Sequence, residues 1–125
     1  MVTTAHQSDN SILYTLGIGV SVNAHISIAK VYGLRFRETN LLCTIHYLSQ
    51  NDQWIYMSKI REFAGMDKIP RNRILFAGLM ESLVEKNMVE QKVEHKKHIL
   101  YRLSRLGKNA LMHYQENINK VLKAP

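Results

Sequence analysis

Apolar residues recur at helical spacing in two stretches of the first half of the chain. Between residues 10 and 32 they predict one long helix that ends near Gly33, since glycine commonly closes a helix in the left-handed conformation. A second helix is predicted over residues 35–50. It begins either near Arg35 or with Thr39 as its cap.

The second half of the chain alternates short strands with helices. Residues 54–56 predict a short strand, and residues 58–64 predict a short helix with Phe63 turned inward. A longer helix is expected over residues 70–86, with Pro70 in its first turn. Two strands, residues 88–94 with Val93 among the apolar positions and residues 98–104, predict a hairpin, and residues 105–123 predict a last helix.

This order of elements predicts an α+β fold, mainly helical, of the winged helix-turn-helix type. We expect one domain over residues 1–125, with a DNA-binding core at residues 35–104 and its wing at residues 88–104. Residues 10–34 and 105–123 are expected to form flanking N- and C-terminal dimerisation helices. The first of these stretches is more apolar than a surface helix needs, and a helix packed within its own subunit is the alternative.

The charge of the chain is concentrated in its second half. The 125 residues carry a formal net charge of +7, and residues 51–125 contribute fourteen basic and eight acidic side chains. A basic half beside a nearly neutral, apolar half favours a polyanionic partner for the former and a protein partner for the latter.

The composition argues against disulfide-stabilised, secreted and membrane-spanning proteins. The single cysteine, Cys43, excludes an internal disulfide framework, and its apolar neighbours predict a buried small side chain. The apolar stretch at residues 12–22 is too short and too mixed to cross a bilayer, and no signal-peptide pattern precedes it. We therefore expect a cytoplasmic protein without membrane contact.

Basic residues stand at the start of the predicted helix over residues 70–86. Arg71, Asn72 and Arg73 lie at the positive end of the helix macrodipole, where each cation is disfavoured by roughly 0.3–1 kcal/mol. An approaching anion would offset this cost, and in helix-turn-helix proteins these positions reach base edges in the major groove. We expect Arg71 or Arg73 to bind guanine and Asn72 to pair with adenine.

Further basic residues are expected to hold the DNA backbone. Lys96 and Lys97 at the hairpin tip, with Lys92 nearby, are expected to reach phosphates or the adjacent minor groove. Three more are expected to contact phosphates and set the register on the duplex: Lys59, Arg61 and Lys68.

No catalytic, cofactor or metal site is predicted. His95 and His98 lack a third ligand at a regular spacing, so they do not form a zinc motif. Paired carboxylates, a nucleophile with its base and a phosphate-binding loop are absent at recognisable spacings. The sequence therefore favours a binding protein over an enzyme.

From Tyr32 to about His113 the chain resembles the MarR-type winged-helix transcriptional regulators. The matching stretches are residues 32–34, residues 83–89 at the end of the second helix of the pair, and residues 103–107, which are similar to the family's Leu-Thr-x-x-Gly before its last helix. Three features depart from the family. His95-Lys96-Lys97 occupy the positions of its Asp-x-Arg wing motif, Asn87 replaces a glycine, and one helix follows the wing where many members have two.

The resemblance implies a homodimer, paired through its first and last helices, that binds a roughly palindromic double-stranded DNA site and regulates transcription. It also implies a small-molecule effector, for which a cleft lined by Tyr14, His25 and Tyr47 is the expectation. PadR-like and other small winged helices are alternative subfamilies. A protein–protein assembly module and a DNA-binding accessory protein of a mobile element are the alternative functions.

Overall fold

The computed structural model describes residues 23–122, which fold as the winged helix-turn-helix predicted from the sequence. Residues 23–32 are helical, and the first half of the long helix expected over residues 10–32 lies outside the described residues. The following elements are α2 (Phe36–Leu48), the 3-10 turn η1 (Gln50–Asp52), β1 (Ile55–Tyr56), α3 (Met57–Phe63), α4 (Pro70–Glu85), β2 (Val89–Glu94), β3 (His98–Leu103) and α5 (Arg105–Leu122). No helix in this range is both long and apolar enough to span a bilayer.

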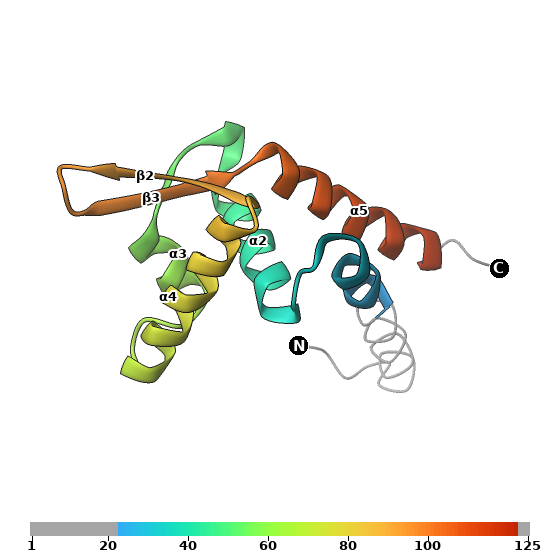
Figure 1. The fold of residues 1–125 in the computed structure, drawn as a ribbon, viewed down its shortest axis with the longest axis horizontal. Helices are drawn as coiled ribbons and strands as arrows, with labels where there is room; N and C mark the ends of the chain where they lie inside the picture. The colour runs from blue at the N-terminus through green and yellow to red at the C-terminus, as the bar shows by residue number, and fades with distance from the viewer. Residues whose placement is uncertain (1–22, 123–125) are drawn as a thin grey trace, which may run out of the picture.

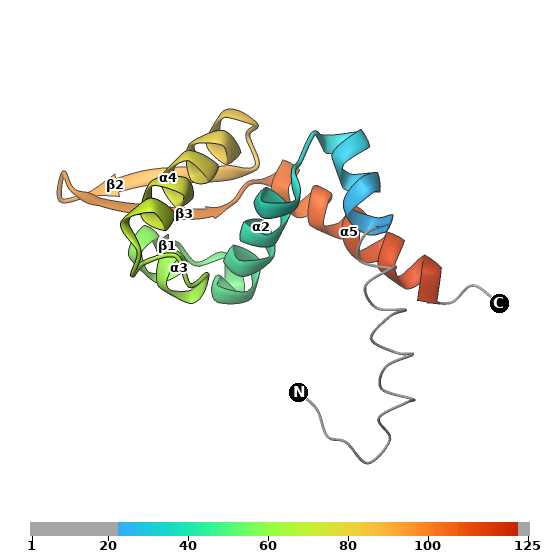
Figure 2. The same ribbon diagram turned by 90° about the horizontal axis from the view of Figure 1, so that it is seen from below.

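The elements separate into two groups joined by α2. Figures 1 and 2 show α3, α4 and the β2–β3 wing at one end, and residues 23–32 with α5 at the other. The strands form an antiparallel sheet in the order β1-β3-β2, in which Ile55 pairs with Tyr101 and Val89 with Leu103. The sheet therefore links the short strand before α3 to the wing.

One apolar core lies under the helix-turn-helix. Its fully buried side chains include six from α2, α3 and α4: Leu42, Ile45, Ile60, Phe76, Met80 and Leu83. The same core reaches Ile28 and Leu34, and also Ala110 of α5. Two inward predictions were wrong, because Phe63 is 56% exposed and Val93 is 57% exposed. The short α3 turns Ile60 inward and leaves Phe63 beside Tyr47, with ring centroids 5.3 Å apart. Val93 is the last residue but one of β2, beside the turn of the wing.

A buried carboxylate organises the start of α2. The helix begins at Phe36 with Arg35 as its N-cap, so Thr39 is not the cap. The Glu38 side chain is fully buried and accepts hydrogen bonds from the backbone N–H of Arg35 at 2.8 Å and from Lys86 Nζ at 2.7 Å. The Ser82 hydroxyl also donates to it. Glu38 therefore joins the first turn of α2 to the last turn of α4.

The charge of Glu38 is held by these donors. Burial alone raises the pKa of a carboxyl group, but the hydrogen bonds from Lys86, Ser82 and Arg35 outweigh burial and lower the pKa of Glu38 to about 2. Lys86 Nζ also donates to the carbonyl oxygen of Gly33 at 2.8 Å. The same ammonium group thus ties the connection before α2 to the end of α4.

Local hydrogen bonds and close packing explain the residue types in residues 103–107, the stretch that resembles the family motif. Ser104 Oγ accepts a hydrogen bond from Gly107 N at 2.9 Å and donates to the carbonyl oxygen of Asn87. A Cβ at Gly107 would overlap the carbonyl oxygen of Met88. Asn87 has a φ of 60°, as expected for the residue that replaces glycine at the end of α4.

We expect Glu38 to dominate the acid sensitivity of the fold. Because its pKa is lowered from 4.5 to about 2, the stability it contributes is present above pH 4.5 and is lost as the pH falls toward 2, by about 3 kcal/mol. Glu38→Gln should lower the free energy of unfolding by about 2–4 kcal/mol at pH 7 and should remove this part of the pH dependence. Urea unfolding followed by Trp54 fluorescence measures both effects.

Glu90→Gln is the matched control. Glu90 is exposed and pairs with Arg102 at 2.6 Å, so its loss should cost less than about 1 kcal/mol. Equal losses in the two variants, or an unchanged acid limb in Glu38→Gln, would contradict the role given to the buried carboxylate.

Candidate nucleic-acid interface

The exposed side of α4 begins with two arginines and continues with small or apolar residues. Arg71 and Arg73 are exposed, and Ile74 is 75% exposed, an unusual position for a large apolar side chain. Ala77 and Gly78 follow on the same side of the helix, and a Cβ at Gly78 would meet no atom within 4 Å. These five residues are called the recognition stripe below. Its flat second half lets the helix backbone approach another molecule closely.

The first turn of α4 contains nothing that neutralises its arginines. Ile69 at the N-cap makes no side-chain cap, Pro70 occupies the first turn, and no acidic residue follows there. Among residues 23–122, neither Arg71 nor Arg73 lies within ion-pair distance of a carboxylate. The unfavourable placement expected from the sequence is therefore retained in the fold, without compensation from the protein.

Asn72 does not lie on the recognition stripe. Its side chain is half-buried and borders a cavity of about 360 Å³ between α4 and α2, together with Asn40 and Leu79. At about 100° of rotation per residue, Asn72 lies on the helix face of the buried Leu79 and Leu83, opposite the exposed side. Its pairing with adenine stays a prediction that this placement does not favour.

The wing tip presents Lys96 and Lys97 to solvent. His95 and Lys96 have φ values of 52° and 65°, and Lys97 N donates to Glu94 O at 3.2 Å. Positive φ at both central positions is typical of type I′ turns, which favour Asn-Gly. His and Lys adopt this conformation at an energetic cost. The tip therefore carries His95 and Lys96 at two positions where Asn and Gly would adopt the turn more easily.

Lys92 lies on the outer face of the sheet, away from the tip. Its Nζ is 3.5 Å from Glu94 Oε2 and 4.8 Å from the centre of the Trp54 ring, over which Arg102 also packs at 4.4 Å. Trp54 thus fastens both wing strands to the segment before β1. The sequence predicts Trp54 only as part of a short strand. The available signal for its packing role is a cation on each of the two later strands, Lys92 and Arg102.

The remaining predicted phosphate contacts belong to α3 and the segment after it. Lys59 and Lys68 are exposed, whereas Arg61 is half-buried and borders a small cavity beside the wing. No carboxylate of the described range lies within ion-pair distance of these three residues. They therefore add positive charge on the wing side of the helix-turn-helix.

The wing histidines form no recognised metal cluster. The rings of His95 and His98 lie edge to face with centroids 6.3 Å apart. In the part of the chain that the structure describes, no group of three His, Cys, Asp or Glu residues is placed to hold a metal ion. Both histidines are exposed parts of the wing.

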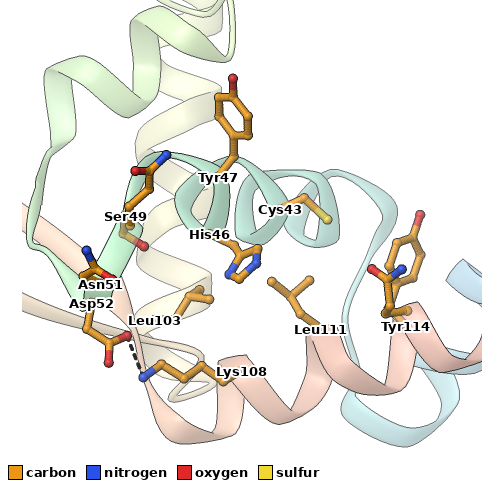
Figure 3. Close-up of a pocket in the computed structure, with 12 residues that line it drawn as sticks. Cys43, His46, Tyr47, Ser49, Asn51, Asp52, Leu103, Lys108, Leu111 and Tyr114 are labelled. Atoms are coloured by element: carbon orange, nitrogen blue, oxygen red, sulfur yellow. Dashed lines mark ion pairs between the residues drawn. The ribbon is translucent and has the colours of Figure 1, made fainter.

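A larger cavity of about 810 Å³ lies between α2 and α5 (Figure 3). Tyr47 and Tyr114 border it, and the Asp52–Lys108 ion pair, 2.7 Å long, stands at its edge. Cys43, expected to be buried, is half-buried and also borders this cavity, and burial raises the pKa of its thiol.

The expected cleft of Tyr14, His25 and Tyr47 is not assembled among the described residues. His25 packs against Phe36 and Tyr114, at ring-centroid distances of 4.3 and 4.9 Å, and borders a separate cavity of about 340 Å³. Tyr14 lies outside the described residues. His25 and Tyr47 therefore face different cavities.

Comparisons with known proteins agree on the fold. No family model matches the sequence, and no curated protein matches it. The transcriptional regulator Tm0710 from Thermotoga maritima is similar with a TM-score of 0.75 at 13% identity, over 94% of this chain and 77% of that one. A MarR-family transcriptional regulator from Rhodococcus has a TM-score of 0.62 at 16% identity, over 95% and 79%.

A third similar structure contains DNA. It is a MarR variant from E. coli complexed with operator DNA, with a TM-score of 0.63 at 13% identity, over 87% of this chain and 72% of that one. At these low identities, the TM-scores show that the three proteins share a fold with this chain. The resemblance noted in the sequence is thus confirmed at the level of architecture: this chain has the winged-helix fold of the MarR-type transcriptional regulators.

Proposed function

We propose that this protein is a sequence-specific DNA-binding transcriptional regulator that acts as a homodimer. The recognition stripe is the observation that carries this proposal. It combines a flat helix surface with exposed arginines that pair with no carboxylate of residues 23–122. The similar MarR structure complexed with operator DNA supports it. The proposal assigns no catalytic step to the chain.

The stripe fits a major groove entered by the first half of α4. Arg71 and Arg73 present bidentate donors suited to guanine, and Ile74 presents an apolar surface suited to the methyl group of thymine. Glu81 and Glu85 lie exposed in the second half of α4, where negative charge disfavours contact with phosphates. Lys96 and Lys97 on the wing, with Lys59 and Lys68, would hold the DNA backbone.

The homodimer is proposed to form through residues 23–32 and α5. Apolar side chains remain exposed on both elements, among them Val31 at 59% and Met112 at 58%. Large exposed apolar side chains gathered on helices away from the wing indicate a surface that a second copy would cover. A dimer would then present two copies of α4 to successive major grooves.

A small effector molecule is proposed to bind the cavity between α2 and α5. Its border combines Leu103, Leu111 and Tyr114 with a few polar groups, which suits a small aromatic compound that carries a polar substituent. The cavity separates the DNA-binding core from a proposed dimer helix, so an occupant would favour one arrangement of the two (Figure 3).

The first test is selection of binding sites from random duplex DNA, followed by affinity measurements over a salt series. Wild type should bind with a steep salt dependence and should enrich a roughly palindromic site. Arg71→Ala/Arg73→Ala should weaken binding to that site by about 1–3 kcal/mol for each arginine and should relax the sequence preference.

Lys30→Ala/Lys120→Ala removes the same two charges from the opposite end of the molecule. Both lysines lie on the proposed dimer helices, so analytical ultracentrifugation first verifies that the control is still dimeric, and it should then keep the selected sequence. If wild type bound no DNA even at low salt, the proposed function as a transcriptional regulator would be overturned, and a role in protein assembly would be favoured.

The wing tip should show opposite effects on stability and binding. His95→Asn/Lys96→Gly supplies residues that adopt positive φ easily, so the free energy of unfolding should rise by about 1–2 kcal/mol. DNA affinity should fall, and the salt dependence should decrease by about one charge because Lys96 is lost. Thermal unfolding and fluorescence anisotropy measure the two effects. An unchanged affinity would remove the wing tip from the interface, and Lys120→Gln provides the control for charge alone.

Dimerisation can be separated from DNA recognition by two charge insertions at exposed apolar residues. Met112→Asp should shift the dimer toward monomer in analytical ultracentrifugation because it places a charge in the proposed interface. Ile74→Asp should remain dimeric and should lose DNA binding through repulsion from phosphates. A wild-type monomer at tens of micromolar, or dissociation by Ile74→Asp, would contradict this assignment.

A further inference from the structure

A small cavity between α3 and the wing is lined by polar and basic side chains. Its volume is about 110 Å³, which is room for roughly three or four waters or one tetrahedral oxyanion. None of its seven bordering residues is acidic: Tyr56, Met57, Ser58, Arg61, Lys97, His98 and Ile99. Arg61 comes from α3, and Lys97 and His98 come from the wing, so two separate elements supply its basic groups.

Arg61, which borders this cavity, has one hydrogen-bond donor without a partner among the described residues. Its Nε is buried and finds no hydrogen-bond partner among residues 23–122. A guanidinium stays charged under all ordinary conditions, and a buried donor without an acceptor is unfavourable. Among the described residues Nε therefore lacks an acceptor. Arg61 is half-buried and borders the cavity, so an anion bound there would supply one once the guanidinium turns Nε toward it.

We propose that this cavity binds one phosphate group of the DNA backbone between Arg61 and Lys97. The inference rests on the proposed function and adds a particular site to it. A phosphate offers several acceptor oxygens, and the planar guanidinium donates to two of them at once. Bound there, the phosphate joins α3 to the tip of the wing and fixes the wing relative to the helix-turn-helix.

This role differs from that of the neighbouring lysines. Lys59 and Lys68 are exposed and attract the DNA backbone as mobile charges, which does not depend on a fixed geometry. Arg61 is half-buried and borders a defined cavity, so its contribution depends on the shape of the guanidinium as well as on its charge. Replacement by lysine separates the two contributions.

The DNA test uses Arg61→Lys, Arg61→Gln and the control Lys59→Gln over a salt series. Arg61→Lys keeps the charge and loses the Nε donor, so affinity should fall about tenfold with an unchanged salt dependence. Arg61→Gln should bind at least as weakly and should lower the salt dependence by about one charge, whereas Lys59→Gln should lose about threefold. Wild-type affinity in Arg61→Lys would overturn the site and leave the DNA-binding proposal standing.

A second test uses no DNA, so it stays informative if the regulator proposal fails. Dimethyl phosphate, which has the monoanionic diester of a DNA backbone, and inorganic phosphate are each titrated into the full chain, and the NMR signals of His98 and Ile99 are followed. Wild type should respond to dimethyl phosphate and Arg61→Lys should not, with thermal unfolding showing that both are folded. A response to inorganic phosphate but not to dimethyl phosphate would show that the cavity binds a free phosphate ion and not a phosphate of the DNA backbone. If neither compound produced a response, the proposed site would be overturned.

Discussion

One buried carboxylate fixes the arrangement of the parts that DNA recognition would require to act together. Glu38 receives hydrogen bonds from Arg35, Ser82 and Lys86 and is fully buried. A buried carboxylate is tolerated only when hydrogen-bond donors surround it. Moving any one of these donors away would leave the buried charge less well compensated, so the carboxylate holds all of them in place. Because Lys86 also holds the Gly33 carbonyl oxygen, the end of α4 is tied to the connection that leads from residues 23–32 into α2.

The opposite side of α2 is packed differently. There the cavity of about 810 Å³ separates α2 from α5, and the Asp52–Lys108 ion pair at its edge is exposed to solvent. Exposed pairs contribute little to stability, so this side resists movement less than the Glu38 side.

Sequence pattern was sufficient for elements whose identity depends on near neighbours. The bounds of α4 and both wing strands differ from the expected ones by one residue at most, because periodicity, Pro70 and Asn87 are local signals. The pattern was insufficient where a distant partner decides burial. Glu38 reads as a surface residue until Ser82 and Lys86 are placed beside it, and the exposure of Phe63 depends on how few residues of the short α3 can face the core.

The site was predictable in its charge and less so in its directions. Arg71 and Arg73 were predicted as DNA contacts from their unfavourable position in the macrodipole, and this stays a prediction; the exposure of Ile74 was visible only when the helix surface was known. Three features of the wing and helix-turn-helix end break local rules: cations at a helix N-terminus, positive φ at His95 and Lys96, and a buried Arg61 Nε without an acceptor. Each gives up stability in the isolated protein, and a phosphate backbone would relieve the first and third and engage the charges displayed by the second. The costs at the N-terminus of α4 and at Arg61 are independent of each other, and one polyanion that offsets both explains them better than two unrelated defects of packing.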